Sequence, residues 1–289
     1  MNTAPKNNSA TPVVSVIMPT WNQARFVGKS IESVLGQTLR ELELIVVNDG
    51  STDDTRTVVA EYAKRDPRIV YLENDKNSGI PYTFNRGVEA ARGKYIARVD
   101  SDDAWIGNDK LAKQVAFLEE HPDYVGAGGG MIVVDPDGKE LYRYFKEETD
   151  GSIHRTALVT NPIASSTGIY RADVLRRVGG FDRELNFNED WDFSLKMGLA
   201  GKLYNFPAYF SYYTSTGKNR SAKDMLPHTM KAFRVLWRYR GKYPGFWHGF
   251  FIHVLQLCYA VIPFGIRKRV HALLWPVKKF LSGKVKHDT

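Results

Sequence analysis

The chain has 289 residues and a mass of 32.8 kDa, which is long enough for a catalytic domain with an appendage. Its 43% hydrophobic and 25% charged residues exclude a disordered chain, and the single Cys258 excludes an intramolecular disulfide and fits a reducing compartment. Residues 1–11 lack the apolar core of a signal peptide, so we expect a disordered leader on a cytoplasmic protein.

The net charge of +8 is concentrated at the C-terminal end. Residues 231–289 contain 12 Lys and Arg and one Asp, a local charge of +11, which leaves −3 for the residues before them. This distribution argues against a nucleic-acid-binding surface and favours an anionic partner for the tail.

The first hundred residues alternate strand and helix patterns. Apolar runs predict strands over 12–20, 41–49, 68–74 and 94–100, and helical spacing predicts helices over 24–37, 56–65 and 82–93. This order predicts a parallel sheet with right-handed crossovers and helices on both faces.

A mixed region follows. The sequence predicts a helix over 110–122, a hairpin over 124–145, a strand and helix over 167–181, and a helix from near Asn188 to Gly201. We attribute the glycines of 126–130 to close strand packing rather than to a ligand cleft.

In open α/β sheets, ligands bind beyond the carboxyl ends of the strands. Asp49 ends the second predicted strand, and "DSDD", residues 100–103, follows the fourth. The first strand is followed by "PTWNQARF" instead of a glycine-rich dinucleotide fingerprint, which argues against a dehydrogenase.

The Asp-x-Asp pattern indicates a divalent cation, because Mg²⁺ takes one or two carboxylates together with phosphate oxygens. In an extended segment Asp100 and Asp102 would face the same way and share one site. The alternative is a solvated acidic turn in which Asp103 caps the next helix.

The sequence resembles family 2 glycosyltransferases of the GT-A fold over about residues 13–214. The matching segments are "SVIMPTWNQ", "LIVVNDGSTDDT", residues 77–105 around the Asp-x-Asp pattern, and "GGFDRELNFNEDWDFSLK". The resemblance implies an α/β domain over residues 12–220, with a Rossmann-like, mostly parallel sheet flanked by helices. The composition of the tail, rather than the resemblance, predicts a helical, amphipathic, membrane-associating appendage over residues 221–289.

The resemblance also implies site residues on the donor side. Asp49 would bind the base or ribose of a sugar nucleotide, beside the segment Pro19, Thr20 and Trp21. Asp100 would lie near the ribose or the metal, and Asp102 would hold Mg²⁺ or Mn²⁺ at the diphosphate.

On the acceptor side, the resemblance makes Asp190 the general base and Glu189 its neighbour or a ligand of the acceptor. For Asp49 and Asp190 the alternative is helix N-capping.

Lys218 or Arg220 would contact phosphate oxygens or belong to a solvated basic loop.

The expected function is inverting transfer of one sugar from a nucleotide-diphosphate sugar, with UDP favoured, to a hydroxyl of a lipid-linked glycan. The pathway would be cell-surface polysaccharide or lipopolysaccharide assembly. Two alternatives stay open: a polyprenyl-phosphate sugar synthase, and a non-catalytic, membrane-bound sugar-nucleotide-binding scaffold.

Residues 243–266 of the tail contain no Asp, Glu, Lys or Arg and are long enough to cross a bilayer. Four polar or helix-breaking residues argue against a span: His248, His253, Gln256 and Pro263. They favour an interfacial or re-entrant helix, on the inner face of the cell membrane. Trp237, Trp247 and Trp275 with flanking basic residues suit an anionic leaflet. The alternative is a helical subdomain packed on the catalytic domain or on a dimer partner.

Overall fold

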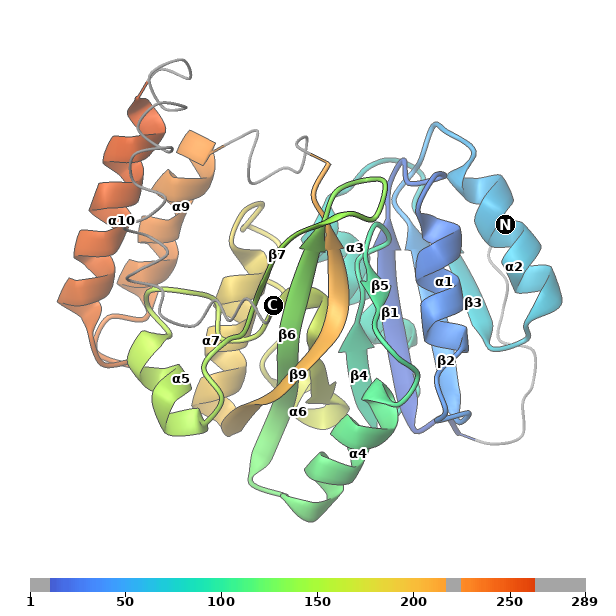
Figure 1. The fold of residues 1–289 in the computed structure, drawn as a ribbon, viewed down its shortest axis with the longest axis horizontal. Helices are drawn as coiled ribbons and strands as arrows, with labels where there is room; N and C mark the ends of the chain where they lie inside the picture. Colours follow the sequence, from blue (N-terminus) through green and yellow to red (C-terminus); the bar gives the residue numbers. More distant parts are fainter. Residues whose placement is uncertain (1–10, 217–224, 263–289) are drawn as a thin grey trace.

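The computed structural model describes residues 11–216 and 225–262 (Figure 1). Its strands form one sheet in the order β3-β2-β1-β4-β8-β6-β9-β5, with β7 paired to β6. The strands are β1 Val14–Thr20, β2 Leu42–Asn48, β3 Ile69–Glu73, β4 Tyr95–Arg98, β5 Ala104–Trp105, β6 Tyr124–Val134, β7 Glu140–Tyr144, β8 Ile169–Arg171 and β9 Lys202–Thr214.

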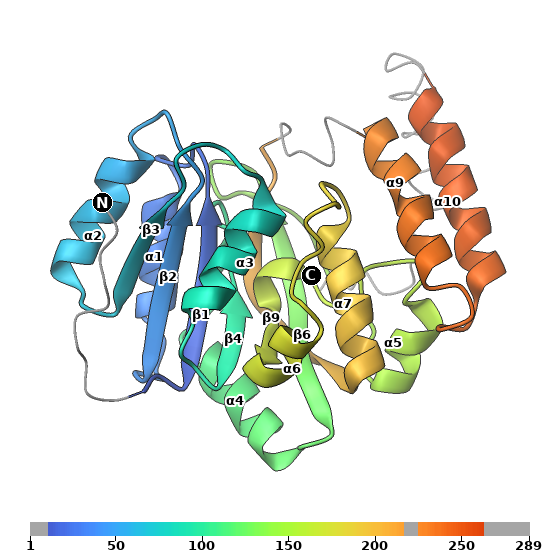
Figure 2. The same cartoon turned by 180° about the vertical axis from the view of Figure 1, so that it is seen from behind.

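Helices cover both faces of this sheet, as predicted. They are α1 Val27–Leu35, α2 Thr55–Arg65, α3 Ile80–Ala90, α4 Lys110–Glu120, α5 Asp150–Thr156, α6 Ala172–Arg177, α7 Glu189–Ala200, α9 Met225–Arg238 and α10 Phe246–Val261. A 3-10 helix, η1, spans Ser165–Thr167. Helices α1, α2 and α4 contribute to one core cluster, whereas α3, α6 and α7 contribute to the cluster on the opposite face (Figures 1 and 2).

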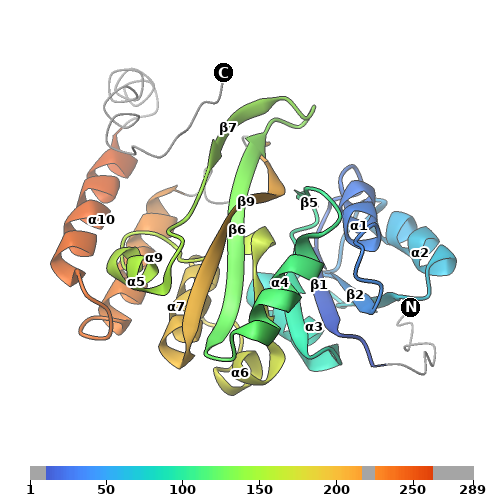
Figure 3. The same cartoon turned by 60° about the horizontal axis from the view of Figure 1, so that its bottom comes forward.

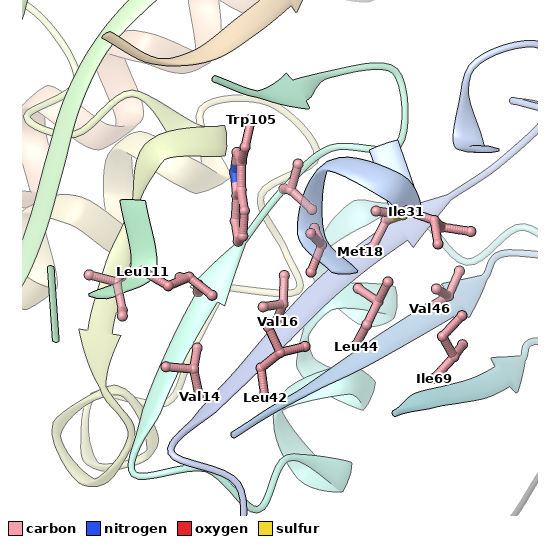
Figure 4. Close-up of a cluster of buried hydrophobic side chains, with 14 of the residues drawn as sticks. Val14, Val16, Met18, Ile31, Leu42, Leu44, Val46, Ile69, Trp105 and Leu111 are labelled. Carbon is pink, nitrogen blue, oxygen red and sulfur yellow. The ribbon is translucent and has the colours of Figure 1, made fainter. Parts of the chain in front are cut away.

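Strands β1 to β4 form the predicted parallel half of the sheet. All seven residues of β1 and of β2 are buried, as expected for central strands covered on both faces. Figure 4 shows side chains of β1 and β2, among them Val16, Met18 and Leu44, packed beneath Ile31 of α1. Because β1, β2 and β4 are parallel and buried in the sheet, the loops that follow them emerge at the same edge of the sheet.

The second half of the sheet is mixed. Among the described strands β8 pairs antiparallel with β4 and β6, whereas the long β9 runs parallel to β6. Four of the eight pairings are parallel and four are antiparallel. The predicted parallel arrangement therefore holds for β1 to β4, and the sheet as a whole is mixed.

The glycine-rich segment lies inside β6, and close packing explains it. A Cβ on Gly129 would lie 2.5 Å from Phe210 Cδ2, and one on Gly126 would lie 2.5 Å from Tyr170 Cδ1. The prediction of close strand packing is confirmed.

The described tail helices pack on α7 and on the segment after α5. Val235 and Leu236 of α9 share a buried cluster with Trp191 and Leu195 of α7. Figure 3 shows α5, α7, α9 and α10 gathered at the end of the molecule opposite α2. His253 is 5% exposed, and its Nε2 lies 3.2 Å from the Leu158 carbonyl oxygen. The alternative of a helical subdomain packed on the catalytic domain therefore describes α9 and α10.

No helix within the described residues has the length and apolar character needed to cross a membrane. Pro263, Trp275, Lys218 and Arg220, as well as residues 1–10, lie outside the described residues.

Candidate active site

The loops that follow β1 and β2 are tied to each other at the carboxyl end of the sheet. The backbone N–H of Asn22 donates to Ser51 Oγ at 2.9 Å, and that of Gln23 donates to Thr55 Oγ1 at 2.8 Å. Trp21 stands at the start of this paired rim with 49% of its surface exposed. The tie holds the Pro19–Trp21 segment close to the end of β2.

Asp49 is 4% exposed and orders the loop before α3. Its Oδ1 accepts from Asn74 Nδ2 at 2.6 Å and from the Ser78 N–H at 2.9 Å, and its Oδ2 accepts from the Gly79 N–H at 2.9 Å. Gly79 is the N-cap residue of α3, whereas α2, the next helix along the chain, has Asp54 at its N-cap. Asp49 therefore does not cap the helix that follows it. Three of its four acceptor positions are used.

Residues 100–103 form a turn, so the predicted extended conformation is wrong. The Asp103 N–H donates to the Asp100 carbonyl oxygen at 3.0 Å, because β4 ends at Arg98 and the chain reverses toward β5. Burial, together with the negative charge of Asp100, raises the pKa of Asp102 to about 6. A shared site for these two carboxylates stays a prediction.

Asp103 is a buried structural carboxylate that the sequence did not single out for this role. It is 2% exposed, its Oδ2 accepts from Ser166 Oγ, and its Oδ1 accepts from the Thr214 N–H at 3.1 Å. Burial raises its pKa well above the ordinary value. Helix α4 has Asp109 at its N-cap, so the alternative that Asp103 caps the next helix is wrong. Asp103 instead joins the turn to η1 and to the end of β9.

The donor set suits a hard dication that is completed by phosphate oxygens. Asp102 is partly buried and feels the negative charge of Asp100, and a bound cation would stabilise its charged form. Within residues 11–216 and 225–262, no group of three or more His, Cys, Asp or Glu could hold a metal ion by itself. Mg²⁺ and Mn²⁺ need only one or two carboxylates when a diphosphate supplies other ligands. The residues present fit such an ion.

A second pair of carboxylates stands at the N-terminus of α7, where the helix dipole favours negative charge. Glu189 is 8% exposed and Asp190 is partly buried. Asp190 Oδ2 accepts from Asn161 Nδ2 at 3.0 Å and from Ser165 Oγ at 2.6 Å, and Oδ1 accepts from the Trp191 N–H at 2.8 Å. These bonds fix the carboxylate and leave one acceptor position on Oδ1.

Asn188, and not Asp190, is the N-cap residue of α7. It adopts a left-handed conformation with φ of 58°, and its Nδ2 donates to the His228 carbonyl oxygen of α9 at 2.9 Å. The N-capping alternative for Asp190 is therefore wrong. Helix α9 helps to hold the start of α7 in place.

Two cations near these carboxylates were not predicted. Lys146 Nζ donates to Thr160 Oγ1 at 2.8 Å, and burial lowers the Lys146 pKa to about 8 against the attraction of Asp190. The Arg98 guanidinium interacts electrostatically with carboxylates of both groups: Asp100, Asp102, Glu189 and Asp190. A charged residue inside the apolar run "YIARV" was an available signal for Arg98. No local pattern marked Lys146.

A parallel half-sheet with a carboxylate turn at its rim, joined to a mixed half that supplies a second carboxylate pair, is an arrangement of the GT-A fold. The chain belongs to glycosyl transferase family 2, which it matches over residues 15–179. The family membership and the fold that the resemblance implied are confirmed.

One sequence relative is the putative teichuronic acid biosynthesis glycosyltransferase TuaG of Bacillus subtilis. It is 45% identical over 135 residues, which cover 46% of this chain and 52% of TuaG. The chain thus spans about half of that relative.

Solved structures share the fold. S. aureus TarS 1–349 in complex with UDP-GlcNAc matches with a TM-score of 0.61 and 24% identity, covering 77% of this chain and 64% of TarS 1–349. The mannosyltransferase PcManGT from Pyrobaculum calidifontis, in complex with GDP-Man and Mn²⁺, matches with a TM-score of 0.60 and 19% identity. That match covers 95% of this chain and 82% of the mannosyltransferase.

Proposed function

We propose that the protein is a metal-dependent, inverting glycosyltransferase that moves one sugar from a nucleotide-diphosphate sugar to a hydroxyl of a glycan. The observation that carries this proposal is the pairing of two carboxylate groups about one guanidinium. Asp100 and Asp102 lie in the turn after β4, Glu189 and Asp190 lie at the start of α7, and Arg98 interacts electrostatically with both groups. A displacement reaction needs this division, with donor binding and acceptor deprotonation in separate places.

The nucleotide would bind at the β1–β2 rim, with UDP as the favoured nucleotide. Asp49 has one acceptor position left on Oδ2 for an N–H or O–H of the base or ribose. Thr20 Oγ1 is buried and has no hydrogen-bond partner among the described residues, so it can bond to a ligand. The exposed ring of Trp21, next to Pro19, offers a surface against the base. The complexes of TarS with UDP-GlcNAc and of PcManGT with GDP-Man support a nucleotide-sugar donor.

Asp102 would hold Mn²⁺ or Mg²⁺, and Asp100 would assist or bind the ribose. The bound cation would supply charge stabilisation to the departing diphosphate. The role of the protein is to hold two carboxylates at the turn in a fixed arrangement. The Mn²⁺ in the PcManGT complex supports this assignment.

Asp190 would act as the general base. Its Oδ2 is saturated by Asn161 and Ser165, so the acceptor hydroxyl would donate to the remaining position on Oδ1. The two bonds to Oδ2 hold the carboxylate in one orientation, which lowers the entropy cost of reaching a reactive geometry. Glu189 would bind a neighbouring acceptor hydroxyl. Attack from the side opposite the leaving diphosphate inverts the anomeric centre.

The acceptor would be lipid-linked and met at an anionic membrane surface, on the cytoplasmic side of the cell membrane. The outer face of α10 exposes Trp247 (75%), Phe251 (60%) and Leu255 (50%). At the turn before it, Arg240 stacks on Trp237 with its guanidinium carbon 4.1 Å from the ring centroid. Exposed apolar side chains flanked by cations and Trp fit an interfacial helix. The name of TuaG, for teichuronic acid biosynthesis, supports a role in surface polysaccharide assembly.

Nucleoside diphosphate release from UDP, GDP and dTDP sugars tests this proposal, measured with Mn²⁺, Mg²⁺ or EDTA and with membrane lipid extract as acceptor source. We expect one donor to be turned over, and EDTA to abolish its turnover. Liposome binding without turnover of any donor would contradict the enzymatic proposal and favour a binding protein.

A further inference from the structure

Arg98 is a charged residue in the centre of the buried sheet. It lies on β4, its backbone N–H donates to the Gly168 carbonyl oxygen at 3.2 Å, and its side chain is 8% exposed. Burial of a cation is costly unless partners compensate it, so this position needs an explanation.

Aromatic rings form a fixed wall beside the guanidinium. Its central carbon lies 5.1 Å from the centroid of Phe181 and 5.8 Å from that of Phe84, and the two rings stack at 4.3 Å. Asn85 holds Phe181 through both backbone groups: its Nδ2 donates to the Phe181 carbonyl oxygen at 2.8 Å, and its Oδ1 accepts from the Phe181 N–H at 2.9 Å. The guanidinium therefore has little freedom to move.

The hydrogen bonds of the guanidinium are unevenly distributed. Nε at 2.9 Å and Nη2 at 2.7 Å both meet Asp100 Oδ1, and Nη1 is buried without a hydrogen-bond partner among the described residues. A salt bridge whose only role was stability would favour two parallel bonds, one to each carboxylate oxygen. Here one oxygen is held and Asp100 Oδ2 is left for another ligand.

The same charge also attracts the carboxylates of α7. Glu189 and Asp190 interact electrostatically with Arg98, and they come from a helix about ninety residues further along the chain. With Asp102, four carboxylates share this guanidinium. The positive charge of Arg98 thus offsets negative charge that both segments bring to this part of the molecule.

We infer that Arg98 is a positioning residue for sugar transfer: it fixes Asp100 through one oxygen and leaves the other for the donor. This inference rests on the proposed function.

Arg98→Met tests the inference, with Arg171→Met as the matched control. Arg171 lies on the neighbouring strand β8, its guanidinium carbon lies 5.7 Å from the centroid of Tyr95, and its Nε donates to the Tyr124 carbonyl oxygen at 2.8 Å. We expect Arg98→Met to lower donor turnover by about 100-fold and to weaken UDP binding in Mn²⁺ by about tenfold. Arg171→Met should change both by less than about twofold at a comparable loss of Tm.

A double-mutant cycle separates positioning from general stability. If Arg98 acts through Asp100, the Arg98→Met and Asp100→Asn effects on UDP affinity in Mn²⁺ will not add, and the double variant will bind like Asp100→Asn alone. Added guanidinium ion should restore part of the turnover of Arg98→Met, and of no other variant. If Arg98→Met does not fold, Arg98→Lys is compared with Arg171→Lys, because lysine keeps the positive charge but lacks the planar guanidinium that donates two hydrogen bonds to one partner.

Additive effects in the cycle, or an Arg98 variant that binds and turns over like its Arg171 control, would overturn the inference. The binding measurement does not depend on turnover. A wild type that binds UDP with Mn²⁺ but releases no product overturns the proposed function and leaves the cycle informative about Arg98. A wild type that binds no UDP, GDP or dTDP overturns both.

Discussion

Asp102 is a partly buried carboxylate whose charged form is disfavoured in the folded protein without metal. Burial and the charge of Asp100 raise its pKa from 3.8 to about 6. Because the folded pKa is the higher one, the native state binds more protons than the unfolded state in this range. Its contribution to stability is therefore present below pH 4 and is lost as the pH rises toward about 6.

The affinity for metal should rise with pH through the same titration of Asp102, because the carboxylate must be deprotonated to bind a cation. We expect the apparent Mn²⁺ affinity to rise by up to about tenfold per pH unit below pH 6 and to level off above it. Calorimetric titration of Mn²⁺ with UDP between pH 5 and pH 8 measures this. Asp102→Asn should lose this metal-dependent binding at every pH, and a variant that keeps the wild-type affinity and pH profile would contradict the assignment.

Asp49 combines a structural role with its proposed contact to the nucleotide. Asp49→Ala would leave the backbone N–H groups of Ser78 and Gly79 without their acceptor. It would also remove one of the two acceptors of Asn74 Nδ2, which donates to Thr83 Oγ1 as well. We expect a loss of about 2–4 kcal/mol in the free energy of unfolding, measured by urea denaturation, together with weaker UDP binding. Asp54→Ala is the control, because Asp54 makes no side-chain cap bond, and it should change stability by less than about 0.5 kcal/mol. Unchanged UDP binding by Asp49→Ala would limit Asp49 to its structural role.

At the scale of elements, the sequence predicts the parallel half well. Strands β1 to β4 are buried apolar runs with turn residues between them, and the observed bounds differ from the predicted ones by a few residues. Strand β9, Lys202–Thr214, was missed because Pro207 and shifts in register against β6 interrupt its pattern. Helix α5 has seven residues and was missed as well.

In the site, too, residues at the ends of periodic strands could be predicted, whereas residues in irregular segments could not. Asp49 and the 100–103 segment could be placed because strand topology brings the carboxyl ends of parallel strands to one edge. The partners of Asp190 are Asn161, in an irregular segment, and Ser165, at the start of the short η1, and Lys146 comes from the chain after β7. Contacts of this kind depend on tertiary structure and leave no periodic signal in the sequence.

Strand β6 depends on its glycines. A Cβ on Gly129 would lie 2.5 Å from Phe210 Cδ2 and 3.0 Å from the Ala208 carbonyl oxygen, and Phe210 is 3% exposed. Because a buried ring and a backbone atom cannot both yield without cost, Gly129→Ala should lower the free energy of unfolding by about 1–3 kcal/mol. Gly151→Ala in α5, where the new Cβ meets its nearest atom at 3.9 Å, should be neutral or stabilise by up to about 1 kcal/mol. Equal effects in thermal or urea unfolding would show that the β6 packing is looser than described.

For the whole molecule, α9 connects the apolar surface of the tail helices to the site. Arg238 of α9 pairs with the fully buried Asp192 of α7 at 2.7 Å, and Tyr239 Oη donates to Asp192 Oδ1 at 3.1 Å. With the bond from Asn188 to His228, these contacts fasten α9 to the first turn of α7, which carries Asp190. The tail helices are thus part of the framework that holds the proposed base.

The proposed membrane face predicts a specific binding defect. Trp247→Glu with Phe251→Glu places charge on the exposed face of α10, so sedimentation with anionic vesicles should fall by about tenfold or more. Leu199→Glu, at a residue that is 45% exposed on α7, is the matched control and should bind vesicles like wild type. A double variant that sediments with vesicles normally but loses a dimer in analytical ultracentrifugation would assign this face to a second copy of the chain.

The central claim is that two separate carboxylates, Asp102 and Asp190, carry donor binding and acceptor activation. Its most direct test is nucleoside diphosphate release from the preferred donor by Asp102→Asn and Asp190→Asn. The control is Asp123→Asn, an exposed residue paired with Lys202 at 2.7 Å. We predict losses of about 100-fold or more in both site variants and wild-type turnover in the control, with metal-dependent UDP binding lost only in Asp102→Asn. An Asp190→Asn variant that keeps more than about a tenth of wild-type turnover would contradict the assignment of the base.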